Sequence, residues 1–189
     1  FMNYSLRDKD FISTGDIFYQ VLGYVHPTKF VFAIPRYIKV SYSTYWRDHD
    51  YYHRVFSQYS TGELKKLEAN ILKDIFKYDS MFDSLMPQIK TEEIKKIYFT
   101  NKWRDYLKSH DSLVSRLYEL IEILKQGANL SYEDFGLTGS MLIGIHNPIY
   151  SDIDLVVYGI SACEKIKSFF ENYPEFILKN IEAIEGLDD

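Results

Sequence analysis

Residues 137–158 read LTGSMLIGIHNPIYSDIDLVVY, and this stretch decides the fold that we expect for the C-terminal half of the chain. An apolar run leads into Gly139-Ser140, eleven residues follow, and Asp152-Ile153-Asp154 then opens the apolar strand Leu155–Val157. Side chains alternate between the faces of a strand, so the two aspartates should point the same way and the isoleucine toward the core. The stretch therefore predicts paired carboxylates after a glycine–serine bend.

These residue types suit a site for phosphorylated ligands. Two carboxylates about 7 Å apart on one strand face can converge on Mg²⁺, which takes oxygen ligands and shares them with substrate phosphates. Gly139 lets the backbone approach a phosphate closely, and Ser140 adds a hydroxyl. A helix that starts with Met141 would offer free N–H groups to an anion. An anion-binding backbone beside metal-binding carboxylates is typical of sites that catalyse phosphoryl or nucleotidyl transfer.

The two halves of this motif carry a resemblance. Gly139-Ser140, the eleven-residue gap and Asp152-Ile153-Asp154 resemble the signature of the DNA polymerase β-like nucleotidyltransferase superfamily, above all its minimal prokaryotic branch. The wider context from Met86 to Gly159 resembles an uncharacterised group of prokaryotic predicted nucleotidyltransferases with an extra N-terminal region.

The resemblance implies an enzyme that moves a nucleoside monophosphate from an NTP such as ATP to a hydroxyl acceptor and releases pyrophosphate. It implies that Asp152 and Asp154 are catalytic residues that bind Mg²⁺ or Mn²⁺. It also implies that Gly139 and Ser140 bind the nucleotide phosphates.

Alternatives stay open beside this interpretation. Gly-Ser and Asp-x-Asp are ordinary turn sequences when each is taken separately. The superfamily adds a third carboxylate on a later strand, whereas Glu182 and Glu185 have the spacing of a helix face. The chain could instead be a catalytically incomplete nucleotide- or nucleic-acid-binding module, or a toxin–antitoxin component. Base preference, oligomeric state, the acceptor (RNA, protein or small molecule) and whether the chain is a fragment of a longer protein are not determined by the sequence.

Composition sets broad limits. Of the 189 residues, 46% are hydrophobic and 26% charged, the balance of a globular protein. No apolar run approaches the roughly 20 residues that a membrane span needs, so we expect no membrane partner. The first residues do not form an apolar signal segment. The single Cys163 excludes an internal disulfide framework, and we expect a cytoplasmic protein.

Charge is distributed unevenly along the chain. Residues 1–110 carry 17 Lys and Arg against 13 Asp and Glu, and residues 111–189 carry 5 against 14. The basic half could supply phosphate-binding groups across a cleft to the acidic half. Two differently charged solvated faces explain the same numbers equally well.

The N-terminal half reads first as an antiparallel sheet. Asp16–Val25 and Phe30–Val40 are rich in aromatic and β-branched residues, with a turn over His26–Lys29 between them. Pro35 cannot donate to a strand ladder, so the second strand should be an edge or carry a bulge.

Residues 41–59 are dense in tyrosine and charge. The rings near Arg47 and Arg54 suit stacking on bases as well as packing on a core. If the segment is helical, His49 and His53 share a face with Asp48 and Asp50 nearby, which is a possible metal site.

Helices should follow. Ser60 and Glu63 have capping-box spacing, and an apolar stripe comes after them. The stripe comprises Leu64, Leu67, Ile71, Leu72, Ile75 and Phe76. Met86-Pro87 should break the chain, and Thr91 could cap a short helix through Ile94 and Ile97. We place a domain boundary near residue 108, after a diffuse basic stretch.

The C-terminal half should alternate helices and strands. A helix starts at Asp111 or Ser112 and ends at Gly127, and a strand over Phe135–Thr138 leads into the glycine–serine bend. Ser161 and Glu164 begin a last helix that Pro174 stops. His146 and Asn147, between the motif halves, read as turn and hydrogen-bonding residues.

The predicted fold class is α+β. Residues 1–108 form an antiparallel sheet plus helices, with the hairpin at 16–40 and helices after 60. Residues 109–189 form a nucleotidyltransferase-type small mixed sheet flanked by helices.

Overall fold

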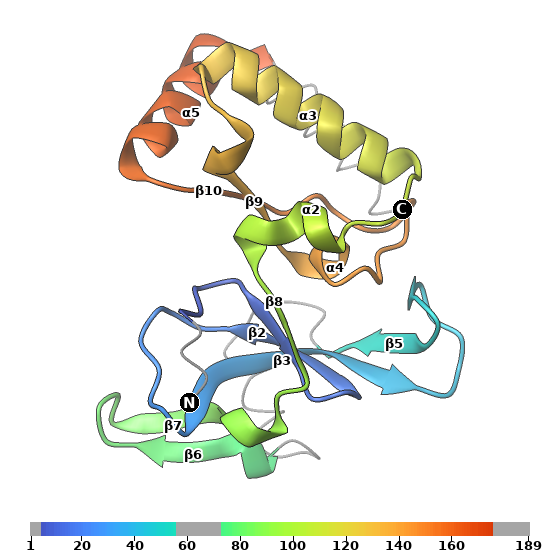
Figure 1. Ribbon diagram of the computed structural model, residues 1–189, viewed down its shortest axis with the longest axis vertical. Coiled ribbons are helices and arrows are strands. Elements are labelled where there is room, and N and C mark those ends of the chain that lie inside the picture. Colours follow the sequence, from blue (N-terminus) through green and yellow to red (C-terminus); the bar gives the residue numbers. More distant parts are fainter. Residues whose placement is uncertain (1–4, 56–72, 176–189) are drawn as a thin grey trace. The chain divides into compact units, whose positions relative to one another are not determined.

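The computed structural model describes residues 5–55 and 73–175, and the chain has an α+β fold (Figure 1). It divides into two compact units, Phe1–Thr100 and Asn101–Asp189. Strands dominate the first unit and helices the second. The sequence placed a boundary near residue 108, and the short helix α2 (Trp103–Tyr106) lies between the two positions.

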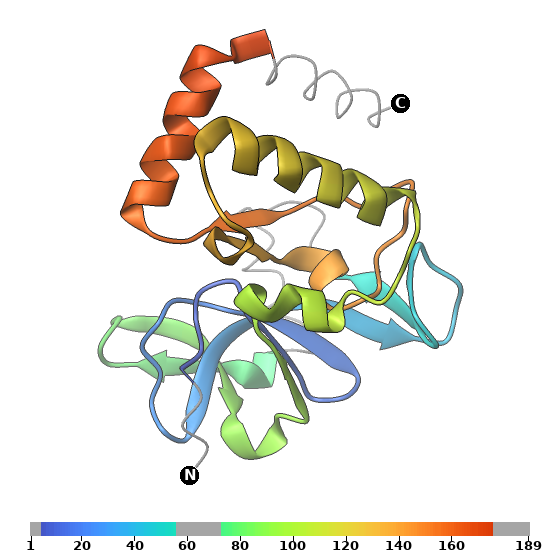
Figure 2. The same ribbon diagram turned by 45° about the horizontal axis from the view of Figure 1, so that its top comes forward.

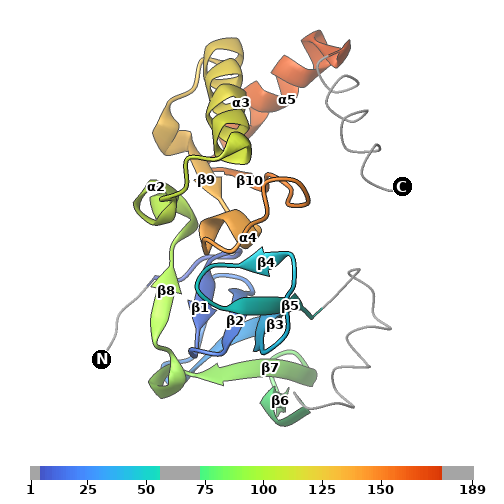
Figure 3. The same cartoon turned by 90° about the vertical axis from the view of Figure 1, so that its right-hand side faces the viewer.

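A curled antiparallel sheet forms the first unit (Figure 3). Its strands are β1 (Phe11–Ser13), β2 (Ile17–Val21), β3 (Phe30–Val40), β4 (Trp46–Arg47), β5 (Tyr51–Arg54), β6 (Phe76–Asp79), β7 (Ser84–Lys90) and β8 (Lys96–Tyr98). The main path runs β4-β5-β3-β2-β1-β8, and β7 pairs with both β3 and β6. The predicted hairpin is therefore confirmed as β2 and β3.

The long strand β3 organises this sheet because it changes partners along its length. One edge pairs with β2 from Ala33 to Ile38, while the other pairs with β7 at Phe30–Phe32 and with β5 at Tyr37–Val40. Opposite β2 the register shifts between Pro35 and Tyr37, so Arg36 is the extra residue of a bulge. The bulge predicted from Pro35 is confirmed. It lies between the part of β3 that pairs with β7 and the part that pairs with β5.

The core of the first unit lies on β1, β2, β3 and β7. Its buried apolar residues are Leu6, Ile12, Tyr19, Val21, Val31, Ala33 and Ile89. Asp10, only 1% exposed, accepts hydrogen bonds from the Thr100 backbone (2.7 Å), the Thr100 hydroxyl (2.8 Å) and the Arg7 backbone (2.9 Å). These bonds fasten the start of β1 to the chain just after β8.

Several expected helices of this unit are replaced by strands. Residues 46–47 and 51–54 are β4 and β5, so the helical arrangement on which the possible His49–His53 metal site depends does not form there. Their aromatic content favours a pleated surface, and pairing with β3 decides the outcome. His53 lies on β5 and His49 in the preceding loop, so the two do not share a helix face.

The Met86-Pro87 break is also wrong, because both residues lie inside β7. Pro87 is opposite Phe76 of β6, and pairing with β3 begins only at Gln88. One edge of β7 is therefore unpaired at Pro87 among the described residues, and proline is tolerated in a strand on such an edge.

The helices expected around this strand are partly corrected. Thr91 opens a 3-10 turn, η2 (Thr91–Glu93), and β8 replaces a helix through Ile97. The stripe from Ser60 to Leu72 lies outside the described residues. Its last two members fall in the 3-10 turn η1 (Lys73–Ile75) and at the start of β6.

The second unit packs two helices on one side of a short strand pair (Figure 2). Helix α3 (Ser112–Ala128) and helix α5 (Ile160–Asn172) contact each other, and β9 (Phe135–Leu137) pairs antiparallel with β10 (Leu155–Val157). The short elements are η3 (Thr100–Lys102), η4 (Tyr132–Asp134) and α4 (Gly139–Leu142). Over residues 101–175 this sheet is purely antiparallel, whereas the resemblance implies a mixed sheet.

Helix α3 begins as predicted and ends differently. The Asp111 side chain caps it by accepting from the backbone of Leu113 (3.0 Å) and Val114 (3.1 Å). The left-handed residue at its end is Asn129 (φ 51°), so Gly127 is not the terminator. Gly127 lies inside the helix against Phe169 of α5, and an added Cβ would overlap that ring.

The last helix is confirmed as α5, but it begins two residues earlier than expected: Gly159 is its N-cap, and the expected Ser161–Glu164 capping box does not form. None of the helices in the described ranges is both long and apolar enough to cross a membrane.

Candidate functional site

The pairing of β9 with β10 brings the two halves of the sequence motif together. Leu155 is opposite Leu137, and the Thr138 backbone N–H donates to the Asp154 carbonyl at 2.9 Å. The chain leaves β9 into Gly139-Ser140 at the point where Asp154 leads into β10. The structure therefore sets the predicted bend and the second aspartate side by side, although eleven residues separate the two halves of the motif.

Gly139 is required at the bend for two reasons. Its φ of +70° lies in the left-handed region, which is costly for residues with a Cβ. A Cβ at this position would also overlap Asp154 Oδ2 and lie 3.4 Å from Asp154 Cγ. The carboxylate of Asp154 thus rests directly against the bare backbone of the bend.

Ser140 is buried and connects the same two segments through its side chain. Its Oγ donates to Ser151 Oγ at 3.2 Å, and Ser151 Oγ also accepts from the Asn147 backbone N–H at 2.9 Å. Ser151 is itself buried and directly precedes Asp152. The sequence missed Ser151, since a serine in a loop carries no signal of its own. The hydroxyl of Ser140 therefore fixes the start of the acidic segment.

The two carboxylates are open to solvent. Asp152 and Asp154 are exposed, and Ile153 between them is half-buried. They lie just before β10 rather than within it. Within the described ranges, no three His, Cys, Asp or Glu side chains gather closely enough to hold a metal ion. Two exposed carboxylates beside a bare backbone fit a hard cation that takes its remaining ligands from water and phosphate.

The loop between the motif halves has a fixed backbone. Asn147 Oδ1 accepts from the N–H groups of Ile149 (2.9 Å) and Tyr150 (3.3 Å), and its carbonyl accepts from Ser151 at 3.0 Å. The prediction that Asn147 is a turn and hydrogen-bonding residue is confirmed, and asparagine before proline is typical of turns. The segment is therefore a closed turn rather than a loose connection.

A buried histidine anchors this loop to α3. His146 Nε2 lies 2.9 Å from Asp111 Oδ2, and only 4% of the His146 side chain is exposed. Burial alone would raise the pKa of Asp111, but hydrogen bonds from Ser109, the Val114 backbone and His146 outweigh it and hold that pKa below its usual value. The sequence could not show this contact, because the partners are 35 residues apart.

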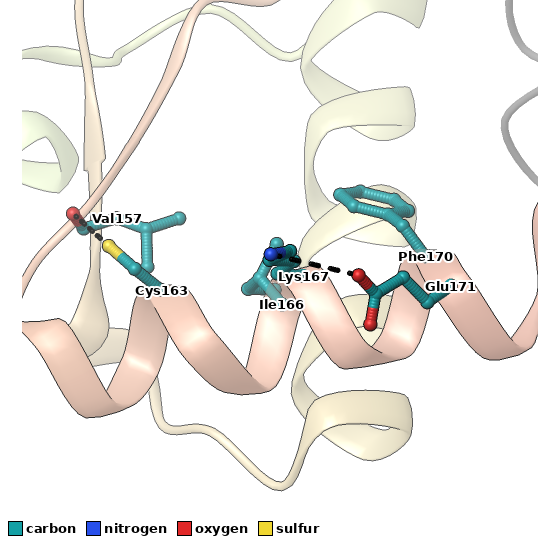
Figure 4. A pocket seen from close by; sticks show the side chains of 6 residues that line it. All are labelled: Val157, Cys163, Ile166, Lys167, Phe170 and Glu171. Carbon is teal, nitrogen blue, oxygen red and sulfur yellow. Dashed lines mark hydrogen bonds and ion pairs between the residues drawn. The ribbon is translucent and has the colours of Figure 1, made fainter.

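An open groove of about 460 Å³ lies elsewhere in the unit, along α5 and β10 (Figure 4). It is lined mostly by apolar atoms of Val157, Cys163, Ile166, Lys167, Phe170 and Glu171. The Cys163 thiol is exposed and lies 3.6 Å from the Val157 carbonyl, and Lys167 is 3.8 Å from Glu171. None of the four predicted site residues lines this groove, so it is separate from the candidate site.

The alternative metal site near His49 is not formed in the first unit. Asp50 is held by Lys39 at 2.8 Å, and Asp48 Oδ1 accepts from the Asp50 backbone at 2.8 Å. His53 is on a strand, so helical spacing no longer brings it beside His49. Among the described residues these side chains do not form a metal-binding group.

Comparison of the chain with family models, with curated proteins and with solved structures finds no match.

Proposed function

We propose that the chain is a Mg²⁺-dependent nucleotidyltransferase that moves a nucleoside monophosphate from an NTP to a hydroxyl acceptor and releases pyrophosphate. The observation that carries the proposal is the contact between Asp154 and Gly139. A left-handed glycine with a carboxylate against it accepts no side chain, and it sets a candidate metal ligand beside the backbone at which the resemblance implies that the phosphates bind. The motif of the polymerase β-like superfamily supplies the class of reaction.

Each site residue has a role that its surroundings support. Asp152 and Asp154 are exposed carboxylates and would hold Mg²⁺ or Mn²⁺. When bound, such a cation neutralises phosphate charge and polarises the phosphoryl group. Gly139 would let the β- and γ-phosphates approach its backbone. Ser140 would bind the phosphates beside Gly139 and, through its hydrogen bond to Ser151, would also keep the bend and the acidic segment at a fixed separation.

The charge of this half of the chain predicts an obligatory metal. Residues 111–189 carry 14 acidic against 5 basic side chains, so a bare triphosphate is repelled. The two aspartates also repel each other when no cation is present. Nucleotide binding should therefore require Mg²⁺ or Mn²⁺ and vanish in EDTA.

A binding module without turnover is the second candidate. The observation that favours it is that no third acidic ligand accompanies Asp152 and Asp154 within residues 5–55 and 73–175. Glu182 and Glu185 lie outside the described residues. In that case the same site binds Mg²⁺–NTP but releases no pyrophosphate. A pyrophosphate-release assay with each NTP and with RNA, protein and small-molecule acceptors separates the two candidates.

Calorimetry of Mg²⁺–ATP tests the site itself. The double variant Asp152→Asn with Asp154→Asn should lose at least about tenfold in affinity while keeping its fold, because both residues are exposed. Glu119→Gln, which removes an exposed acid from α3, is the matched control and should bind as the parent does. The proposal fails if the parent chain does not bind Mg²⁺–ATP, or if the double variant binds it equally well.

A further inference from the structure

Two exposed side chains at the tip of the loop between the motif halves are not explained by the site described so far. Ile149 is 70% exposed and Tyr150 52% exposed, directly before buried Ser151 and the carboxylate of Asp152. A single exposed apolar residue needs no explanation. A consecutive pair that lies two and three positions before Asp152 is a different matter, because it places an apolar surface beside a candidate metal ligand.

The backbone of this tip is already in one conformation. Asn147 Oδ1 accepts from both tip N–H groups, at 2.9 Å and 3.3 Å, and the Asn147 carbonyl holds Ser151 at 3.0 Å. A ligand that meets a fixed tip does not have to order it first, and preorganisation of this kind increases affinity.

The base of the loop is held as firmly as its tip. His146 contacts Asp111 at the start of α3, and Ser151 accepts from Ser140. The tip therefore keeps a constant position relative to the acids. Tyr150 and Asp152 are two positions apart in the chain, so their Cα atoms lie at most about 7 Å from each other. A group bound at Asp152 and a ring resting on Tyr150 can belong to one small molecule.

We propose that Tyr150, supported by Ile149, is the surface on which the nucleoside part of the substrate rests while its triphosphate lies at the aspartates and Gly139. This inference rests on the proposed function and specifies one end of the substrate. Every base has a π-face, so an aromatic platform tolerates all bases. The tip sequence Pro148-Ile149-Tyr150 has no amide or charged side chain with which to read base edges. ATP, GTP, CTP and UTP should accordingly bind with similar affinity.

Two ligands that differ only in the nucleoside separate this contact from the phosphate site. Affinities of Mg²⁺–ATP and Mg²⁺–tripolyphosphate are measured by calorimetry for the parent, Tyr150→Ala and Tyr150→Phe. Tyr150→Ala should weaken ATP binding by about 5- to 150-fold, the range for loss of one stacked base, and leave tripolyphosphate binding unchanged. Tyr150→Phe keeps the ring and should bind ATP as the parent does. Tyr173→Ala removes a tyrosine of similar exposure (51%) from the end of α5 and should change neither affinity.

The outcomes distinguish this inference from the function on which it rests. If Tyr150→Ala binds ATP with the affinity of the parent while the double aspartate variant loses both ligands, the proposed contact of Tyr150 with the nucleoside is wrong, and the proposed phosphate site is still supported. If Tyr150→Ala weakens both ligands equally, the residue acts by shaping the loop, and the platform is again wrong. If the parent binds neither ligand, the proposed function falls and the platform falls with it.

Discussion

At the scale of single residues, two glycines, one at the start of α4 and one just after it, differ in one informative way. Gly139 and Gly144 both have positive φ, +70° and +76°. A Cβ on Gly139 would meet the Asp154 carboxylate, whereas a Cβ on Gly144 meets no atom within 4 Å. Gly144→Ala therefore introduces backbone strain alone, and Gly139→Ala introduces the same strain together with displacement of a proposed metal ligand.

Both alanine variants should lose about 1–2 kcal/mol of unfolding free energy in urea, the usual cost of a left-handed non-glycine residue. Only Gly139→Ala should lose Mn²⁺ affinity as well, by about 10- to 100-fold, because Asp154 is pushed from its position. Mn²⁺ titration followed by electron paramagnetic resonance measures this. Equal Mn²⁺ affinity in the two variants would show that the Gly139–Asp154 contact has no bearing on metal binding.

At the scale of elements, one carboxylate at the N-terminus of α3, that of Asp111, has two structural roles. Asp111 caps the helix through two backbone N–H groups, and it also holds the buried His146. A change at Asp111 should therefore reach the loop that carries the candidate site, although the residue is 41 positions before Asp152.

The stability of this element should depend on pH in a defined direction. The pKa of Asp111 is lower in the folded chain than its ordinary value of 3.8. Its contribution is complete above that ordinary value and is lost as the pH falls through about 3.8 toward the folded pKa. Urea unfolding at pH 3 to 6 should show a steeper loss on acidification for the parent than for Asp111→Asn, since asparagine caps helices about as well. Identical pH profiles would contradict this assignment.

The crossing of α3 and α5 gives a second prediction at this scale. Alanine is favoured over glycine in an exposed helix by about 1 kcal/mol, but at Gly127 the added methyl overlaps the Phe169 ring. We expect Gly127→Ala to lower the unfolding free energy by about 1–3 kcal/mol, as overpacking does. Thermal denaturation measures this, and Phe169→Leu in the same chain should recover part of the loss. A stabilised Gly127→Ala variant would mean that the helices do not pack closely at this point.

At the scale of the whole molecule, the chain consists of two units with separate means of stabilisation. The first depends on a sheet fastened by the buried Asp10, and the second on α3, α5 and the β9–β10 pair. A ligand that binds only the folded form of one unit stabilises that unit. The proposed function places all ligand contacts in the second unit.

Hydrogen exchange should separate the two units. Mg²⁺–ATP at 100 times its dissociation constant should protect β9, α4 and β10 by up to about 2.7 kcal/mol and leave β1 and β8 unchanged. Asp10→Ala removes the acceptor of the backbone N–H and hydroxyl of the fully buried Thr100, so it should speed exchange in β1 and β8 by an amount equivalent to about 1–3 kcal/mol. Protection by Mg²⁺–ATP confined to the first unit would contradict the proposed location of the site.

The sequence predicts those features of the fold that have local causes. The β2–β3 hairpin, the bulge after Pro35 and the cap at Asp111 each follow from neighbouring residues. The spacing of the motif likewise predicts that the Gly139 bend and Asp154 lie together.

The features that it misses depend on distant partners. Pairing with β3 makes residues 51–54 a strand, and an unpaired edge tolerates Pro87. The His146–Asp111 contact and the fit of Gly127 to Phe169 join segments that no local pattern relates.

The backbone hydrogen bond between Thr138 and the Asp154 carbonyl closes the segment between them into a ring of chain. The residues at the tip of this segment do not take part in the pairing of β9 with β10, so substitutions there should leave that pairing in register. Pro148, Ile149 and Tyr150 could then be exchanged as a cassette while the acids remain in place. If Tyr150 contacts the nucleoside as proposed, a library randomised at these three positions should change ligand preference without altering β9 or β10.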